Sequence, residues 1–125
     1  MRMPGLSIRE LADGQALVFG IEDRISTDML PAVHETVLAA IRHCTRVVIA
    51  DFSRATYISS SGPGLLAHYT RFFGARGIPV LAVRGPTEVM RRLAPTGVER
   101  MVPFYDSLQD ALERAGLTKP IEAPE

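Results

Sequence analysis

Three consecutive serines, Ser59, Ser60 and Ser61, are the residues of this chain whose types and spacing could support chemistry. They follow the apolar segment RVVIADF and stand directly before the tripeptide GPG and a second apolar run. One serine at such a joint can cap a helix, which accounts for one hydroxyl but not for three. The free N–H groups and positive dipole of a helix start also stabilise an anion. The segment is therefore a candidate for a phosphate carried on one of the serines.

Three catalytic or nucleotide-binding motifs compete for the same segment. A nucleophile elbow, Gly-x-Ser-x-Gly, fails at Ser60 because Ile58 stands where the first glycine is required. A phosphate-binding loop needs a lysine, and the chain has one lysine, Lys119, far from the glycines. Residues 62–67 formally match Gly-x-Gly-x-x-Gly/Ala, and Arg84 at the end of the next predicted strand could meet a 2′-phosphate. The pattern starts halfway along a short chain, so a small nucleotide-binding protein is the weaker alternative.

The composition is that of one soluble globular domain. The chain has 125 residues, 46% hydrophobic and 22% charged, enough for a proper core. Lysine plus arginine equals aspartate plus glutamate at 14 each, so we expect no direct binding to nucleic acid. Cys44 is the single cysteine, and neither a signal peptide nor a membrane-spanning run is present, so we expect a cytoplasmic protein without membrane insertion. His34, His43 and His68 lack metal-ligand spacing, and we expect no metal; we interpret His34 as a residue at the edge of the core.

The elements that must position the serines alternate between strands and helices. Apolar periodicity and turn residues predict strands at 6–11 and 15–21, joined by a two-residue turn at Asp13-Gly14. A helix should start near Asp28, with Leu38 beside its apolar face, and a strand should follow at 47–50. The pattern continues with a helix at 62–73 that has Pro63 in its first turn, a strand at 78–83 and a helix from Pro86 to Gly97. A strand around 101–104 and a last helix with Asp106 and Gln109 at capping-box spacing complete it. The order β-β-α-β-α-β-α-β-α predicts an α/β fold. We expect one domain at residues 1–117, a mostly parallel sheet with an antiparallel N-terminal hairpin and helices packed on it, and a flexible tail at 118–125.

The segment VVIADFSRATYISSSGPGLLAHY resembles the signature of STAS domains, in particular of the bacterial anti-sigma factor antagonists. That family has an apolar strand ending in Asp, here Asp51, then a short connection, an apolar residue, Asp, Ser or Thr, a small residue, Gly-Leu-Gly and a helix. FGIEDRIS resembles the family's Gly-x-x-Asp segment and places Asp23 on its Asp, and FYDSLQDAL resembles its final strand-to-helix passage. Two positions depart from the pattern: Ser59 replaces the Asp, and Pro63 replaces the Leu between the glycines.

The resemblance implies a partner-switching regulator and not an enzyme. The unphosphorylated domain would bind an anti-sigma factor that is also a serine kinase, and a sigma factor would thereby be freed. Phosphorylation at Ser60, with Ser59 and Ser61 as alternative acceptors, would weaken the complex, and a serine phosphatase would restore it. ATP would belong to the kinase, so the domain itself would hold no cofactor, and we expect a monomer or weak dimer.

The same resemblance implies a docking surface around the serines. It would comprise the loop after the second strand, the serine segment and the exposed side of the following helix. The residues we expect in it are Asp23, Ser26, Thr27, Arg54, Ser59, Ser61, Gly62 and Gly64. Arg54 can equally be a solvated loop charge. Because Ser59 replaces the usual Asp, a second interpretation stays open, in which the chain is a constitutive STAS adaptor subunit of a transport ATPase or of a stress-signalling scaffold.

Overall fold

The computed structural model of the chain describes residues 2–3, 5–22, 27–58 and 61–117. Its strands are β1 (Arg2–Met3), β2 (Leu6–Leu11), β3 (Ala16–Ile21), β4 (Val47–Asp51), β5 (Val80–Val83) and β6 (Phe104–Tyr105). Within the described residues these strands form one sheet in the order β1-β2-β3-β4-β5-β6. The pairs β1–β2 and β2–β3 are antiparallel, and the pairs from β3 to β6 are parallel. The predicted fold class, a mostly parallel sheet with an antiparallel N-terminal hairpin, is confirmed.

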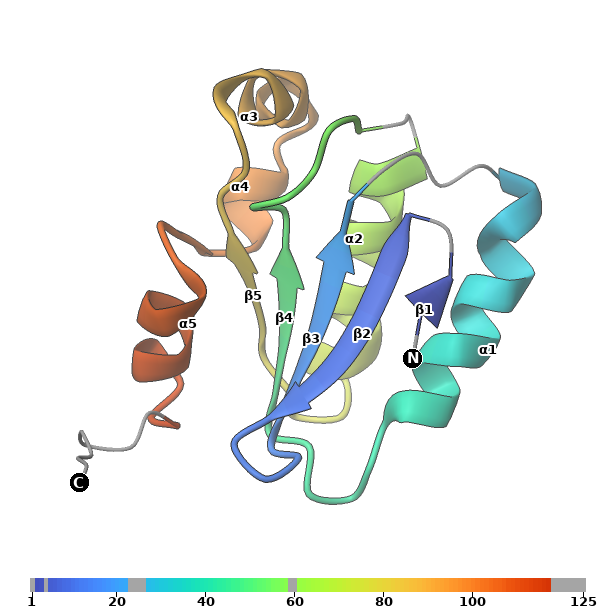
Figure 1. Ribbon diagram of the computed structural model, residues 1–125, viewed down its shortest axis with the longest axis vertical. Helices are drawn as coiled ribbons and strands as arrows, with labels where there is room; N and C mark the ends of the chain where they lie inside the picture. Colours follow the sequence, from blue (N-terminus) through green and yellow to red (C-terminus); the bar gives the residue numbers. More distant parts are fainter. Residues whose placement is uncertain (1, 4, 23–26, 59–60, 118–125) are drawn as a thin grey trace.

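Helices cover both faces of this sheet (Figure 1). They are α1 (Leu30–Ala40), preceded by a 3-10 turn at Thr27–Met29; α2 (Ser61–Gly74); α3 (Thr87–Leu93), followed by a 3-10 turn at Ala94–Thr96; α4 (Val98–Met101); and α5 (Leu108–Arg114). The alternation of strand side chains separates two cores. In β4, Val48 and Ala50 pack with residues of α1, α2 and α3, whereas Val47 and Ile49 pack against α5.

The uniformly apolar middle strands follow from this double cover. Residues 47–50 of β4 and all of β5 are buried, as expected of parallel strands with helices on both faces. An apolar cavity of about 60 Å³ lies between the sheet, α1 and α2, lined among others by Ala50, Leu66 and Tyr69. No helix in the described ranges has the length and hydrophobicity that a bilayer crossing requires.

The N-terminal hairpin is confirmed, but its turn is longer than predicted. Leu11 pairs with Ala16, so four residues connect the strands instead of two. Ala12, Asp13 and Gly14 all adopt positive φ, at 54°, 57° and 86°. The Asp-Gly pair therefore lies within a wider left-handed turn, whose Gly14 N–H donates to the Leu11 carbonyl.

Three local expectations near the C-terminal half and α1 are wrong. The strand predicted around 101–104 is shorter and later, because the Val102 N–H donates to the Val98 carbonyl and keeps 98–101 helical. The last helix is capped by Ser107, whose hydroxyl accepts from the Asp110 N–H, and not by Asp106. Leu38, expected beside the apolar face of α1, is 55% exposed.

Candidate functional site

The candidate site lies at the edge of the sheet where the parallel strands β3, β4 and β5 end. Parallel strands place their carboxyl ends together, so the loops that follow them meet there. Both the N–H and the hydroxyl of Thr56 donate to the Glu22 carbonyl, at 3.1 Å each. The Phe52 N–H donates to the Val83 carbonyl at 3.1 Å. These contacts tie the segment after β4 to the ends of β3 and β5.

A glycine allows the loop after β5 to approach this segment closely. A Cβ on Gly85 would lie 2.6 Å from the Phe52 carbonyl oxygen and 3.2 Å from the Phe52 Cβ. Since real Cβ atoms do not approach a backbone oxygen that closely, a side chain at this position would push the two loops apart. Gly85 therefore allows the loop after β5 and the segment after β4 to pack closely at this edge.

The segment between β4 and α2 alternates between buried anchors and exposed polar residues. Phe52, Ala55 and Ile58 are at most 5% exposed and pack in the larger core. Ser53, Arg54 and Thr56 are exposed, and the Ser53 N–H donates to the Asp51 carboxylate at 2.9 Å. The three anchors fix the path of the chain towards the serines, while the polar residues between them face solvent.

The first turn of α2 has the sequence SGPG and contains no acidic residue. Pro63 lies in this turn, as predicted, where its missing N–H costs no helical hydrogen bond. The two glycines beside it differ. A Cβ on Gly62 would lie 3.2 Å from Ile58 Cγ2. A Cβ on Gly64 would meet no described atom within 4 Å other than those of its chain neighbours and of the α2 backbone. Nothing within the described molecule therefore requires the absence of a side chain at Gly64.

A polar hollow of about 380 Å³ adjoins the same edge on the face that carries α5. Its polar lining comprises Ser7, Arg9, Glu22, Asp51, Ser53 and Arg54. The Ser7 hydroxyl donates to the Glu22 carboxylate at 3.2 Å. Arg54 is thus an exposed cation at the border of a hollow that also contains two carboxylates, and its interpretation as a solvated loop charge remains open.

The predicted site residues are described only in part. Asp23, Ser26, Ser59 and Ser60 lie outside the described residues, as does the predicted tail at 118–125. Thr27 begins the 3-10 turn before α1, and Ser61 begins α2. The segment after β4, which contains Arg54, and the start of α2, which contains Gly62 and Gly64, lie at the same edge of the sheet as the start of α1 (Figure 1).

Sequence reasoning missed the partners of two arginines near this edge, Arg92 and Arg84. The Arg92 guanidinium of α3 lies 5.3 Å from the centre of the Tyr57 ring, which is two residues before the serines. The sequence gives no signal for this pair, because the residues are distant along the chain and lie on different elements. Arg84, considered above for a 2′-phosphate, forms ion pairs with Glu99 and Asp106 at 3.4 and 3.3 Å, which argues against that role.

A second missed group joins α1 to α2 further from the edge. His34 Nδ1 and the Tyr69 hydroxyl form a hydrogen bond, and the rings of His34 and His68 lie 5.4 Å apart. Burial raises the pKa of Tyr69 to about 12. His34 is partly buried, consistent with a residue at the edge of the core. In the described ranges no three side chains of the His, Cys, Asp or Glu type come together as a metal site would require.

Comparisons with known proteins give the same fold. A family model described as the STAS domain matches residues 9–111. An anti-sigma factor antagonist from Mycobacterium paratuberculosis is 20% identical, with a TM-score of 0.72 over 89% of this chain and 92% of that one. The anti-sigma factor antagonist SpoIIAA in its unphosphorylated form is 15% identical, with a TM-score of 0.71 over 91% and 99%. The STAS domain of a SulP transporter from Vibrio cholerae is 22% identical, with a TM-score of 0.63 over 80% and 79%. The sequence has no match among curated proteins.

Proposed function

This chain belongs to the STAS domain family, and from that premise we propose that it is an anti-sigma factor antagonist. In its unphosphorylated form it binds an anti-sigma factor that is also a serine kinase, so that a sigma factor is released. The domain supplies a surface and a phosphate acceptor, and the kinase supplies ATP and the catalytic groups. The structural neighbours whose titles describe anti-sigma factor antagonists support this proposal at the level of the fold.

The observation that carries the proposal is the open first turn of α2. Glycine in a helix costs roughly 0.5–1 kcal/mol relative to alanine, so an unconstrained glycine there calls for an explanation. Gly64 has free space around the position of a Cβ. A partner whose backbone or side chain packs closely on α2 needs that space, and exposed Arg54 lies at the same edge to provide a charge for it.

Phosphorylation of Ser60 would then act on the partner and leave the fold intact. A phosphoserine adds about −1.5 to −2 charges near neutral pH. Ser60 immediately precedes α2, whose first turn holds no acidic residue, so the helix dipole would stabilise the added charge. The anti-sigma factor would instead meet a desolvated charge in its interface, which costs affinity. Ser59 and Ser61 are adjacent to Ser60 in the sequence and remain alternative phosphate acceptors.

The test uses a recombinant anti-sigma factor with a serine-kinase domain and the full chain. After incubation with ATP, cleavage at Arg54 and Arg71 releases the peptide 55–71, whose mass and fragmentation locate the phosphate. We expect one phosphate on Ser60, lost in Ser60→Ala and retained in the matched variant Ser61→Ala. Binding by calorimetry should be at least tenfold weaker for Ser60→Asp than for Ser60→Ala, with unchanged thermal unfolding.

Equal affinity of Ser60→Asp and wild type would contradict the switch. A protein that is never phosphorylated yet binds its partner would instead favour a constitutive STAS adaptor of a transport or signalling assembly. Two observations favour that second candidate: Ser59 replaces the family's Asp, and the STAS domain of a SulP transporter shares the fold.

A further inference from the structure

A basic pocket of about 550 Å³ opens at the opposite end of the parallel strands. The loop between α1 and β4, the loop between α2 and β5, and the end of α5 surround it. Its lining includes Arg42, His43, Arg46 and Arg76 and contains no carboxylate. We call these residues, together with Thr45, the basic pocket. Its volume falls in the range of about 300–1,000 Å³ typical of small-molecule sites.

Two of the three arginines carry charge that no carboxylate in the described residues neutralises. Arg46 Nη1 donates to the neutral side-chain oxygen of Gln15 at 3.1 Å. Arg76 Nη1 donates to the Phe72 carbonyl at 3.0 Å, and its guanidinium lies 3.8 Å above the centre of the Phe72 ring. These contacts orient both guanidinium groups, but neither group has a carboxylate partner among the described residues.

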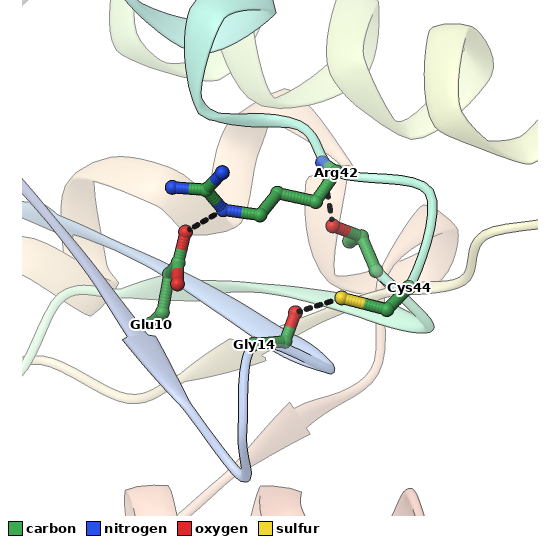
Figure 2. Close-up of polar contacts among 5 residues, drawn as sticks. Glu10, Gly14, Arg42 and Cys44 are labelled. Atoms are coloured by element: carbon green, nitrogen blue, oxygen red, sulfur yellow. Dashed lines mark hydrogen bonds and ion pairs between the residues drawn. The ribbon is translucent and has the colours of Figure 1, made fainter.

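Arg42 differs from Arg46 and Arg76, because its charge is paired with the carboxylate of Glu10. Its Nε lies 2.6 Å from a carboxylate oxygen of Glu10, and Figure 2 shows the side chain extended from its loop towards β2. This hydrogen bond raises the pKa of Arg42. Arg42 therefore fixes the rim of the basic pocket, and Arg46 and Arg76 supply the charge that a ligand would meet.

The pocket is also held in shape before any ligand arrives. Thr45 is 8% exposed, and its hydroxyl accepts from the Arg42 N–H at 3.1 Å. In the described part of the chain the Thr45 hydroxyl donates to no acceptor, so this hydroxyl can donate a hydrogen bond to a ligand. The N–H groups of Arg46 and Val47 both donate to the Gln15 carbonyl, at 2.7 and 3.1 Å. A preorganised pocket with free donors loses little entropy on binding.

We propose that the basic pocket binds a small phosphate-bearing anion. A guanidinium group can form bidentate hydrogen bonds with phosphate oxygens. Two arginines without a carboxylate partner among the described residues favour a ligand with more than one negative charge. The five residues of β4, about 16 Å at roughly 3.3 Å per residue, separate this pocket from the carboxyl edge of the sheet. The site is therefore independent of the proposed partner switch, and failure of one proposal leaves the other intact.

The probe is inorganic pyrophosphate, titrated into the full chain and followed by amide chemical shifts. We expect shifts concentrated at residues 42–47 and 76–79. The double variant Arg46→Gln/Arg76→Gln should bind at least tenfold more weakly. The control Arg100→Gln removes one charge from an exposed position of α4, as each single variant Arg46→Gln or Arg76→Gln does, and should change affinity less than twofold. Arg76→Lys keeps the positive charge but loses the bidentate donor geometry of the guanidinium group, so we expect a partial loss of pyrophosphate affinity.

Shifts scattered over the surface, or equal weakening by Arg100→Gln, would refute the proposal, because either result indicates unspecific charge attraction. If the double variant unfolds, the single variants decide, each with an expected loss of about threefold. Sedimentation with phosphatidylglycerol vesicles distinguishes the source of the phosphate. Binding that depends on Arg46 and Arg76 assigns a lipid headgroup, and pyrophosphate binding without vesicle binding assigns a soluble anion.

Discussion

Replacing Gly64 by alanine tests whether the open first turn of α2 exists for a partner. The change adds one methyl group at an exposed position of a 14-residue helix. Apart from the chain neighbours and the backbone of α2 itself, no described atom lies within 4 Å of the new Cβ, and Gly64 is not among the glycines with positive φ. The methyl group therefore creates no strain inside the molecule, and the unfolded chain loses conformational freedom.

The expected gain in the free energy of unfolding is about 0.5–1 kcal/mol, the difference between glycine and alanine in a helix. With an unfolding entropy of roughly 2.1 cal/mol/K per residue, a chain of this length has about 0.26 kcal/mol/K. The midpoint of thermal unfolding should thus rise by about 2–4 °C. Affinity for the proposed anti-sigma factor partner should fall, because an added methyl group in a close-packed interface with the partner costs about 1–3 kcal/mol.

Circular dichroism melting and calorimetric titration measure the two effects on the same samples. Gly62→Ala is the matched control, because its Cβ would lie 3.2 Å from Ile58 Cγ2 and should cancel much of the gain in stability. A lower melting midpoint for Gly64→Ala would refute the reasoning, since the glycine would then have a role within the fold. A higher midpoint with unchanged affinity would place the partner away from the first turn of α2.

Four further substitutions test the packing around the site and between α1 and α2. Ala50→Val should raise the free energy of unfolding by up to about 1.4 kcal/mol, because at about 24 cal/mol per Å³ that is the cost of the 60 Å³ cavity beside it. Ala82→Val, equally buried but not at the cavity, should lower it by about 1–3 kcal/mol, and chemical denaturation compares the two. Gly85→Ala should lower the melting midpoint by several degrees, because its Cβ would lie 2.6 Å from the Phe52 carbonyl oxygen. The raised pKa of Tyr69 gives stability that is fully present below pH 10 and is lost as the pH rises to about 12, so the stability difference between wild type and Tyr69→Phe should shrink over that interval.

Local patterns were sufficient to predict the hairpin, the buried strands and α2. Each of these elements carries its own signal: alternation in β3, a continuous apolar run in β4, and helical spacing after the serines in α2. β1 was not predicted, because two residues cannot show a period and their pairing with β2 depends on the hairpin already being in place. The turn at 98–101 was missed for a related reason, since Val98 and Val102 suit a strand as well as a helix.

The candidate site was predictable as an edge of the sheet but not as a set of contacts. The serines follow a central strand, and topology alone places such a loop at the carboxyl edge. The contact between Tyr57 and Arg92 and the one between His34 and Tyr69 each join two elements that are distant in sequence. Pairs of this kind arise from the packing of helices on the sheet, and no spacing rule in a single sequence encodes them.

The two ends of the parallel strands differ in charge, and this difference argues for two different ways of using an anion. At the carboxyl edge the polar hollow is lined by Glu22 and Asp51 as well as by Arg9 and Arg54, so a diffusible anion is repelled as well as attracted there. The phosphate proposed on serine would be attached covalently, so it would not depend on attraction by the residues of this edge. At the amino edge Arg46 and Arg76 face a pocket without carboxylates, where an anion can bind and leave by itself. Covalent modification therefore suits the carboxyl edge, and reversible binding suits the amino edge. The two proposals concern separate sites at opposite ends of the same parallel strands.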